Sequence, residues 1–296
     1  MNKYLSKNKK VSSETTREAF NFNFSKYIEN KPEHIKNVDL NFLEWFIGFS
    51  EGDGSFVVSN ERCYFIINQK DIKALYKIKK KLGFGQVLKY TQNNKFYGRY
   101  IVQDKKNCKR LAYIFNGNLV LEKTNIRFKI WLKTLNMQPL EKKEYLTLNN
   151  AWLSGFIDAE GGFYASLTKQ TNLKLKYRLR LKFYITQKYE YDLLKAIITL
   201  FYFKQKNIKK SILFNPNKYI STSSKNINRL EVSTNSLILV ILDYLTEYKL
   251  QSKKLITFFR WKRIYLNKDI LKNLAIKSKK NLTRFKKLVN AVNKKN

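Results

Sequence analysis

The chain has 296 residues, of which 44% are hydrophobic and 15% aromatic, a composition typical of folded globular proteins. Its 59 lysines and arginines outnumber 22 acids and give a formal net charge of +37. A fold with this charge repels itself unless an anionic partner neutralises it, so nucleic acid is the first partner class to consider and a membrane surface the second. No apolar run approaches the roughly 18 residues of a membrane span, so we expect no membrane-embedded segment.

The rarer residue types narrow the chemistry further. The two cysteines, Cys63 and Cys108, and the single histidine, His34, exclude a Cys/His zinc cluster and argue against a disulfide framework. Lysine, asparagine, isoleucine, tyrosine and phenylalanine are plentiful and proline is rare, which is the residue choice of an AT-rich gene. We therefore expect a reducing setting and a gene carried by the organelle in which the protein works, a mitochondrion before a chloroplast.

The first half of the chain changes from a helical to an alternating pattern. Residues 1–38 are polar and without a sustained period, which predicts an N-terminal extension. A helix then begins at Asp39 or Asn41, either of which can cap it, and leads into the segment FIGFSEGDGSF at residues 46–56. The following pattern predicts a hairpin at 55–59 and 62–69, a helix at 71–82, a second hairpin at 86–91 and 96–104, and helices at 106–116 and 123–136.

The segment LSGFIDAEGGF, residues 153–163, repeats the first segment, and similar elements follow it in the same order. These are strands at 162–169 and 174–187, a helix at 191–201, a loosely matched strand region at 203–234, and helices at 236–248 and 252–266. We therefore divide the chain into an extension (1–38), a first repeat (39–134), a linker (135–149), a second repeat (150–266) and a basic tail (267–296).

Each repeated segment places small residues four apart on one helical face. They are Gly48 and Gly52 in the first copy and Gly155 and Ala159 in the second, and they would allow two helices to approach closely. Each copy also ends in an acid before glycine, Asp53 and Glu160. A helix cap is one interpretation of these acids, but a carboxylate at a helix C-terminus opposes the helix dipole. Two such acids side by side would favour a bound cation.

The repeated motif resembles that of the LAGLIDADG homing endonucleases in their single-chain form with two motifs. The resemblance covers residues 40–266 and implies an α+β fold of two pseudo-symmetric αββαββα repeats. It implies that the motif helices pack at a central interface and that two antiparallel four-stranded sheets form a saddle over DNA. It further implies that Asp53 and Glu160 bind Mg²⁺, a site that Mn²⁺ or Ca²⁺ can also occupy, with the backbone of Gly52 and Ala159 as further ligands.

Four more residues match family positions near the scissile phosphates. Gln69 and Gln187 follow predicted strands, where the family places polar residues that position water or metal; a hydrogen-bonded glutamine at a strand end is the plain alternative. Lys123 and Lys253 match a lysine that stabilises phosphate charge. Because lysine is abundant in this chain, only their shared spacing to Trp131 and Trp261 favours this role.

One strand carries a binding signal of its own. In residues 174–183 every second residue is basic, so a strand would carry five cations on one face. Such a row matches a phosphate track or a base-reading ribbon. The candidate DNA-binding residues are therefore Lys174, Lys176, Arg178, Arg180 and Lys182, with Arg62 at the place of Arg180 in the first repeat and Arg99 on its second hairpin.

Together these features predict a metal-dependent, monomeric endonuclease that hydrolyses both strands of DNA at a long, nearly non-palindromic site. Two alternatives remain: an intron maturase of the same fold, which would bind its own intron RNA, or a nuclease-inactive binding protein. A general RNA-binding protein would explain the charge but not the paired acids. We expect no membrane partner and no obligate protein partner.

Overall fold

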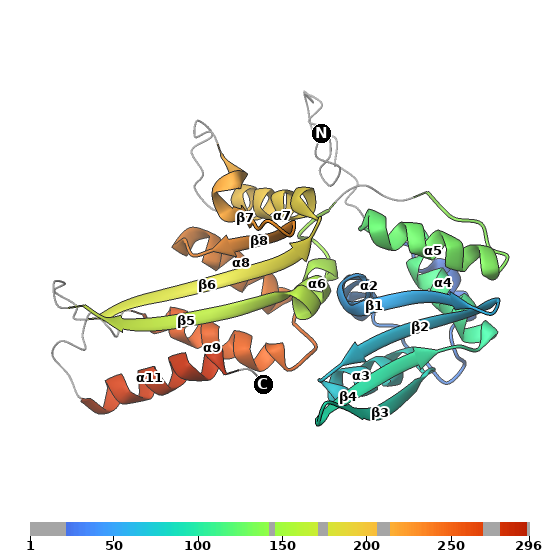
Figure 1. The fold of residues 1–296 in the computed structure, drawn as a ribbon, viewed down its shortest axis with the longest axis horizontal. Coiled ribbons are helices and arrows are strands. Elements are labelled where there is room, and N and C mark those ends of the chain that lie inside the picture. The colour runs from blue at the N-terminus through green and yellow to red at the C-terminus, as the bar shows by residue number, and fades with distance from the viewer. Residues whose placement is uncertain (1–21, 142–145, 171–176, 206–213, 269–278, 295–296) are drawn as a thin grey trace. The chain divides into compact units, whose positions relative to one another are not determined.

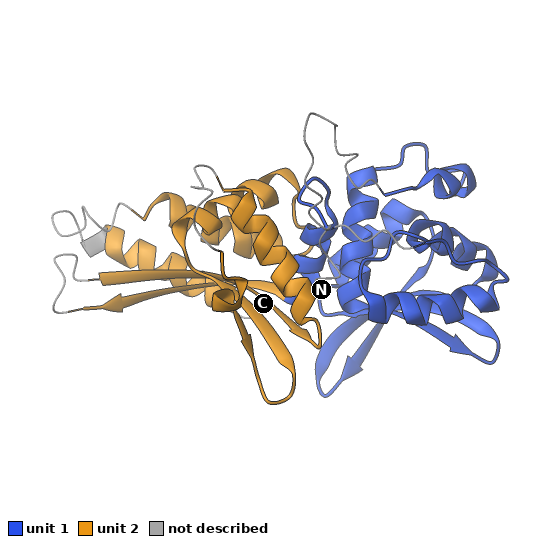
Figure 2. Cartoon of the chain, turned by 90° about the horizontal axis from the view of Figure 1, so that it is seen from above, with its two compact units in different colours: residues 1–160 blue, residues 161–296 orange. Residues whose placement is uncertain are grey.

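The computed structural model describes residues 22–141, 146–170, 177–205, 214–268 and 279–294. The chain forms two compact units, residues 1–160 and residues 161–296 (Figure 2). Each unit holds one four-stranded antiparallel sheet together with helices, which confirms the predicted α+β class and the two equivalent sheets. Among the helices in the described ranges, none is long and apolar enough to cross a membrane.

The first unit follows the predicted order of elements (Figure 1). Its sheet has the strand order β1-β2-β4-β3. The elements are α1 (Ser25–Asn30), α2 (Leu40–Asp53), β1 (Gly54–Ser59), β2 (Arg62–Gln69), α3 (Ile72–Leu82), β3 (Gln86–Gln92), β4 (Lys95–Val102), α4 (Lys105–Phe115), α5 (Glu122–Thr134) and α6 (Trp152–Glu160).

Turn chemistry sets both hairpins of the first unit. Asn60 and Glu61 have φ values of 48° and 60°, and Asn93 and Asn94 have values of 50° and 55°. Two consecutive residues with positive φ form the two-residue turn whose twist matches that of the strands, and asparagine tolerates this region well. The turns lie where the sequence predicted them, so the strand register follows from local sequence.

The second unit has the same sheet order in its own strands, β5-β6-β8-β7. Its last helix follows a segment outside the described residues. The elements are β5 (Gly161–Lys169), β6 (Tyr177–Lys188), α7 (Tyr191–Phe203), a short 3₁₀ helix (Pro216–Tyr219), β7 (Ile220–Thr222), β8 (Ile227–Val232), α8 (Asn235–Glu247), α9 (Lys254–Leu266) and α11 (Lys279–Asn293).

Each sheet buries one face and leaves the other accessible. In β2, Phe65 and Ile67 are fully buried, and in β6 Phe183 and Ile185 are fully buried, while the residue between each pair is half-buried. This alternation is the period-two pattern of a strand with one core face. The outward face of each sheet is therefore available to a partner.

Helix α11 closes an otherwise open edge of the second sheet. β5 is an edge strand, and the side chain of Asn293 accepts a hydrogen bond from Ala165 N at 3.2 Å and donates one to Ala165 O at 2.6 Å. Phe285, Val289 and Val292 are buried, and α11 packs against α9 and β5. The predicted basic tail is therefore, from residue 279, an integral helix of the second unit.

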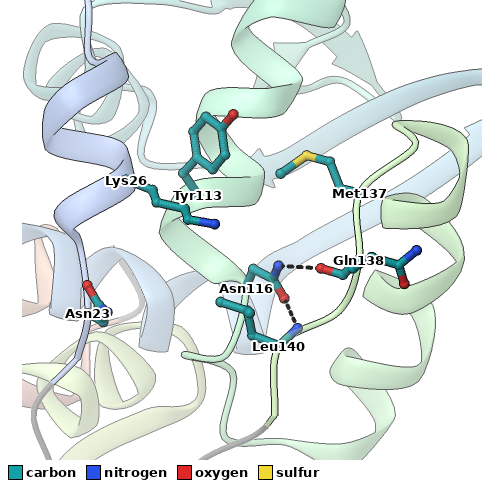
Figure 3. A pocket seen from close by; sticks show the side chains of 7 residues that line it. All are labelled: Asn23, Lys26, Tyr113, Asn116, Met137, Gln138 and Leu140. Atoms are coloured by element: carbon teal, nitrogen blue, oxygen red, sulfur yellow. Dashed lines mark hydrogen bonds between the residues drawn. The ribbon is translucent and has the colours of Figure 1, made fainter.

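The first unit also contains a helix inside the predicted N-terminal extension. Helix α1 was not predicted, yet Tyr27 is buried and the Asn118 side chain bonds both N and O of Asn23. A hollow of about 310 Å³ lies nearby (Figure 3). It is lined by Asn23, Lys26, Tyr113, Asn116, Met137, Gln138 and Leu140. The boundary between the two units falls at Glu160, because α6 packs on α2 and so belongs to the first unit.

Candidate active site

The two motif helices, α2 and α6, meet at their glycines. A Cβ built on Gly48 would overlap the carbonyl oxygen of Trp152 and lie 2.9 Å from Phe156 N. The relation is reciprocal, because a Cβ on Gly155 would overlap the carbonyl oxygen of Trp45. Main chain touches main chain here, so any side chain at these positions would push the helices apart. The predicted close approach through Gly48 and Gly155 is present.

The next pair toward the helix ends is Gly52 and Ala159. A Cβ on Gly52 would overlap the Ala159 side chain and lie 3.1 Å from Cγ of Glu160. The helices are therefore still in contact one turn later, where the acids stand. All four predicted interface residues contribute to this seam.

A buried acid on each helix binds a tryptophan on the other. Trp45 Nε1 donates to Asp158 Oδ2 at 2.8 Å, and Trp152 Nε1 donates to Glu51 Oε2 at 2.6 Å. The other oxygen of Glu51 accepts from Val120 N at 2.9 Å and Leu121 N at 2.6 Å. Glu51 and Asp158 are 4% and 3% exposed. These hydrogen bonds hold the helices together.

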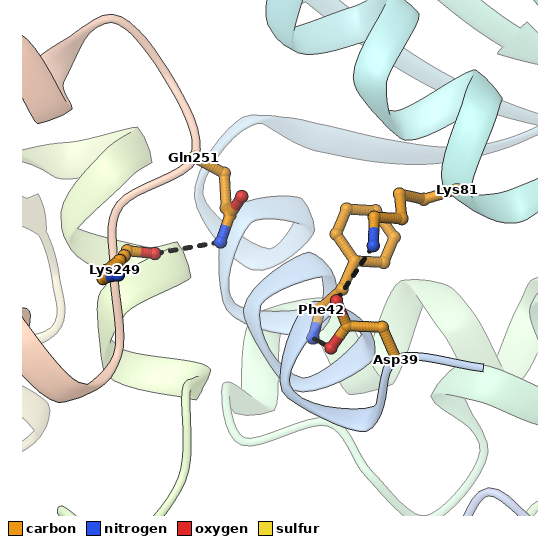
Figure 4. A network of polar contacts seen from close by, with 5 residues as sticks. All are labelled: Asp39, Phe42, Lys81, Lys249 and Gln251. Atoms are coloured by element: carbon orange, nitrogen blue, oxygen red, sulfur yellow. Dashed lines mark hydrogen bonds and ion pairs between the residues drawn. The ribbon is translucent and has the colours of Figure 1, made fainter. Parts of the chain in front are cut away.

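At the start of α2, two further acids fix the helix. Asp39 caps it by accepting from Phe42 N at 3.0 Å, and Lys81 donates to its other oxygen at 3.0 Å (Figure 4). Burial alone would raise the pKa of Asp39, but these hydrogen bonds and the charges of Lys81 and Lys77 outweigh it and lower the pKa. Glu44 accepts from Ala151 N at 2.9 Å, and burial raises its pKa.

The candidate metal ligands end the two helices. Asp53 is the last residue of α2 and Glu160 the last of α6, and both are half-buried. Glu160 Oε1 lies 3.6 Å from the Cβ position of Gly52, the neighbour of Asp53. Gln69 Nε2 donates a hydrogen bond to Asp53 Oδ2. The structure thus brings together Asp53, Glu160, Gln69 and the backbone of Gly52 and Ala159.

The glycines after the acids do not form the usual left-handed cap. Gly54 has φ −88° and ψ 155°, and its N–H donates to Ser50 O as β1 begins. A Cβ on Gly54 would lie 2.5 Å from that same oxygen. Glycine is therefore needed for close packing and not for a positive φ. The helix turns directly into a strand, which leaves the carboxylate at the junction and weakens the cap interpretation of Asp53.

The donor set suits a hard divalent cation. Carboxylate and carbonyl oxygens are the ligands that Mg²⁺ and Ca²⁺ prefer. In the described ranges, no cluster of three or more His, Cys, Asp or Glu side chains could hold a metal. A pair of carboxylates leaves several coordination positions to water and phosphate oxygens, which is how Mg²⁺ is usually bound at phosphate-transfer sites. The residues present therefore fit a divalent cation such as Mg²⁺.

The other predicted site residues are placed within their own units. Lys123 lies in the first turn of α5 in the first unit and is half-buried. Lys253 immediately precedes α9 in the second unit and is also half-buried, while Gln187 is 5% exposed near the end of β6. Their roles in catalysis stay predictions.

The outward face of the first sheet carries Arg62 and Arg99. Arg62 is exposed at the start of β2, and Arg99 lies on β4 opposite Asn68 of β2. Arg99 Nε donates to Asn68 Oδ1 at 2.9 Å, and its guanidinium lies 5.3 Å from the ring centre of Tyr90. The facing of Arg99, which the sequence left open, is therefore outward.

The outward face of the second sheet carries the basic row only in part as predicted. Arg178 and Arg180 are exposed on β6, and Lys182 is half-buried. Lys182 donates to Glu231 of β8, so one acid interrupts the cationic surface. The remaining members of the row, Lys174 and Lys176, lie outside the described residues.

Sequence reasoning missed several residues of these surfaces. Trp45 and Trp152 occupy equivalent places in the two motif helices, and this correspondence could have revealed them. Asn68 and Thr186 each directly precede a candidate glutamine, and this shared position could have identified them as a pair. Arg229 and Glu231 lie beyond a segment where the two repeats differ in length, so no alignment of motifs pointed to them.

Comparisons with known proteins agree with this architecture. A family model described as LAGLIDADG endonuclease matches residues 46–135 and 153–265. The probable intron-encoded endonuclease 4 of Neurospora crassa is 36% identical in an alignment of 235 residues that covers 76% of this chain and 40% of that protein. The intron-encoded RNA maturase bI4 of Saccharomyces cerevisiae is 30% identical over 64% of this chain and 32% of its own length. The chain thus spans about two fifths or less of these curated relatives.

Among solved structures, I-SmaMI bound to an uncleaved DNA target in the presence of calcium ions is similar in fold. The TM-score is 0.64 at 19% sequence identity, and the match covers 86% of this chain and 99% of that one.

Proposed function

This chain belongs to the LAGLIDADG endonuclease family, and from that membership we propose that it is a site-specific double-strand DNA endonuclease, a homing endonuclease. Its target would be a long, nearly non-palindromic duplex, because the two repeats carry different side chains on their outward sheet faces. The observation that carries the proposal is the pair of carboxylates, Asp53 and Glu160, at the ends of two helices in main-chain contact. A purely binding protein has no need to place two acids together on a strongly cationic chain.

Asp53 and Glu160 would hold Mg²⁺, with backbone oxygens of Gly52 and Ala159 as additional ligands; Mn²⁺ or Ca²⁺ could take its place. The bound ion would make a water nucleophilic and offset the charge on the phosphate and the leaving oxygen. Gln69 fixes the orientation of Asp53 through its hydrogen bond. The similarity to I-SmaMI, whose structure contains a DNA target and calcium ions, supports a divalent metal site.

The remaining site residues would act on the phosphates. Gln187 is the counterpart of Gln69 and would position water or metal near a scissile phosphate. Lys123 and Lys253 would place positive charge near the scissile phosphates, where added negative charge develops during hydrolysis. The basic side chains predicted on the two sheets would contact the DNA. They are Arg62, Lys174, Lys176, Arg178, Arg180 and Lys182.

The setting follows from the relatives. Both curated relatives named above are intron-encoded, so we infer that this protein is encoded in an organelle, a mitochondrion in the first instance. Both motifs lie on one chain, so no second subunit is required to complete the pair of acids.

A second function is favoured by one observation, the similarity to the RNA maturase bI4. A maturase would bind its own intron RNA and promote splicing with or without DNA cleavage. Splicing of the host intron, assayed beside DNA cleavage with the same protein preparation, separates the two activities.

The test is cleavage of a randomised duplex library with Mg²⁺. The wild-type chain should select and cut one long site, while Asp53→Asn and Glu160→Gln should bind that site and leave both strands uncut. Asp243→Asn on the exposed face of α8 removes the same charge from a residue that is not a candidate ligand and should cut normally. Undiminished cutting by either site variant would refute the assignment of the carboxylates.

Binding should also be strongly salt-dependent. Each phosphate neutralised by a cationic side chain adds about −0.9 to the slope of log affinity against log salt concentration for duplex DNA. A slope near zero would contradict a phosphate-contacting surface.

A further inference from the structure

Both sheets hold an arginine in the same place. In the first sheet Arg99 pairs across the strands with Asn68, and in the second Arg229 pairs with Thr186. Asn68 and Thr186 directly precede the two candidate glutamines, Gln69 and Gln187. Arg99 and Arg229 are therefore equivalent positions of the two repeats, although they were not recognised as a pair in the sequence.

Each arginine is held on an aromatic ring and by a side-chain oxygen. Arg99 lies over Tyr90 at 5.3 Å from the ring centre, and its Nε donates to Asn68 at 2.9 Å. Arg229 lies over Tyr184 at 3.9 Å from the ring centre, and its Nη1 donates to Thr186 at 3.4 Å. A stacked, hydrogen-bonded guanidinium has lost part of its rotamer freedom before any ligand binds, so less is lost on binding.

This arrangement suits recognition of a base rather than a phosphate. The planar fork of arginine matches O6 and N7 of guanine in the major groove, the commonest specific contact between proteins and DNA. Nε of Arg99 already donates its hydrogen bond to Asn68. The two terminal nitrogens of the guanidinium are left to donate to the two guanine atoms. A contact to phosphate alone would need neither the aromatic support nor a fixed plane.

The position also indicates which base pairs are read. Arg99 lies beside Asn68, and the next residue, Gln69, contacts the candidate ligand Asp53. Bases contacted from here are therefore close to the scissile phosphate of that half-site. By equivalence, Arg229 would read the corresponding place in the other half-site.

The two arginines differ in one neighbour. Glu231 Oε2 lies 3.7 Å from Nε of Arg229, and its other oxygen accepts from Lys182. Glu231 pairs with Tyr184, whereas the matching pair in the first sheet, Ile101 with Ile66, is apolar. Arg229 must share its donors with an acid, while Arg99 has no such carboxylate at the equivalent place.

Resting on the proposed endonuclease function, we propose that Arg99 and Arg229 are equivalent guanine-reading residues, one in each half-site. Glu231 weakens the discrimination made by Arg229, so the two half-sites are read with unequal stringency at the same relative position.

The experiment measures base preference by binding and sequencing of a randomised duplex library, in an Asp53→Asn background to prevent cutting. Arg99→Lys keeps the charge and loses the fork, so it should lower the guanine preference at one position by about 5- to 150-fold. Arg229→Lys should produce a smaller loss at the equivalent position of the other half-site. Glu231→Gln should sharpen the preference there, and thermal melting of each variant checks that it is folded.

Arg127→Lys, an exposed change on α5, which is a helix and not part of either sheet, is the control and should leave every position unchanged. Uniform weakening at all positions by Arg99→Lys and Arg229→Lys would overturn the proposal in favour of phosphate contacts. An unchanged profile in both variants would overturn it as well. Failure of the parent protein to enrich any duplex would instead refute the proposed function, and with it this inference.

Discussion

The main chain of Gly48 lies against the carbonyl group of Trp152, with no room for even one methyl group between them. Alanine is normally favoured over glycine inside a helix by about 1 kcal/mol. Gly48→Ala should nevertheless destabilise the protein by about 3 kcal/mol or more, because backbone atoms cannot move aside as a flexible side chain can. Urea denaturation measures the change, and Gly155→Ala should behave in the same way.

The control for this prediction is Ser50→Ala in the same helix. The buried Ser50 hydroxyl is without a hydrogen-bond partner in the described ranges, so its removal should be neutral or stabilising. Equal losses for Ser50→Ala and Gly48→Ala would show that the close helix contact is not the cause.

The indole hydrogen bond to Glu51 should contribute measurably to stability. Trp152→Phe removes the donor from a buried carboxylate, and hydrogen bonds to charged groups are worth about 1.5–3 kcal/mol. Trp131→Phe is a matched control, because Trp131 is equally buried and its Nε1 has no partner in the part of the chain that the structure describes. The difference in unfolding free energy between the two variants isolates the hydrogen bond. A difference of zero would contradict its role.

The two hydrogen bonds between the Asn293 side chain and the backbone of Ala165 should stabilise the second unit. Asn293→Ala removes both hydrogen bonds to Ala165 and should cost about 1–2 kcal/mol in denaturant unfolding. Asn290→Ala is an exposed change on the same helix and should stay within about 0.5 kcal/mol of wild type. Similar values for the two variants would mean that α11 is held by its apolar side chains alone.

Asp39 should make stability depend on pH in the acid range. Its folded pKa is lowered, so its charged form contributes stability above its unfolded pKa of about 3.9. That contribution is lost as the pH falls through the folded pKa. Asp39→Asn keeps a good cap but cannot titrate, so wild type should lose more stability than this variant between pH 5 and pH 3.

This effect should be small, because the side chains of Asp39 and Lys81 are 46% and 42% exposed. Solvent screens such an ion pair, so its contribution to the free energy of unfolding is below about 1 kcal/mol. At neutral pH, Asp39→Ala should lower the free energy of unfolding by about 1 kcal/mol more than Asp39→Asn does, because alanine also removes the helix cap. Thermal melting over this pH range checks both statements. Parallel curves for wild type and Asp39→Asn would rule out a contribution from the charge.

Much of the fold was predictable because its signals are local. The turns at Asn60-Glu61 and Asn93-Asn94 fix two hairpins within a few residues, and the repeated motif located α2 and α6. The seam between these helices was predictable from small residues at fixed spacing. Each of these features depends on neighbours in the sequence or on an internal repeat.

What could not be predicted depends on distant contacts. Glu51 bonds residues about seventy and one hundred positions away, and nothing near it in the sequence names those partners. The carboxylate of Glu231 interrupts a row that looks purely basic in its own strand. Helix α1 is too short for a periodic signal and forms because Tyr27 is buried against the first unit.

The bond between Asn293 and Ala165 also has a consequence for biosynthesis. The two residues are 128 positions apart, so a ribosome adding about 5–20 residues per second would need roughly 6–26 s to make the second after the first. During that interval the backbone groups of Ala165 lack the partner that closes the strand edge. The nascent second half is then most exposed to pairing with a neighbouring chain, and emergence of Asn293 from the ribosome ends this period.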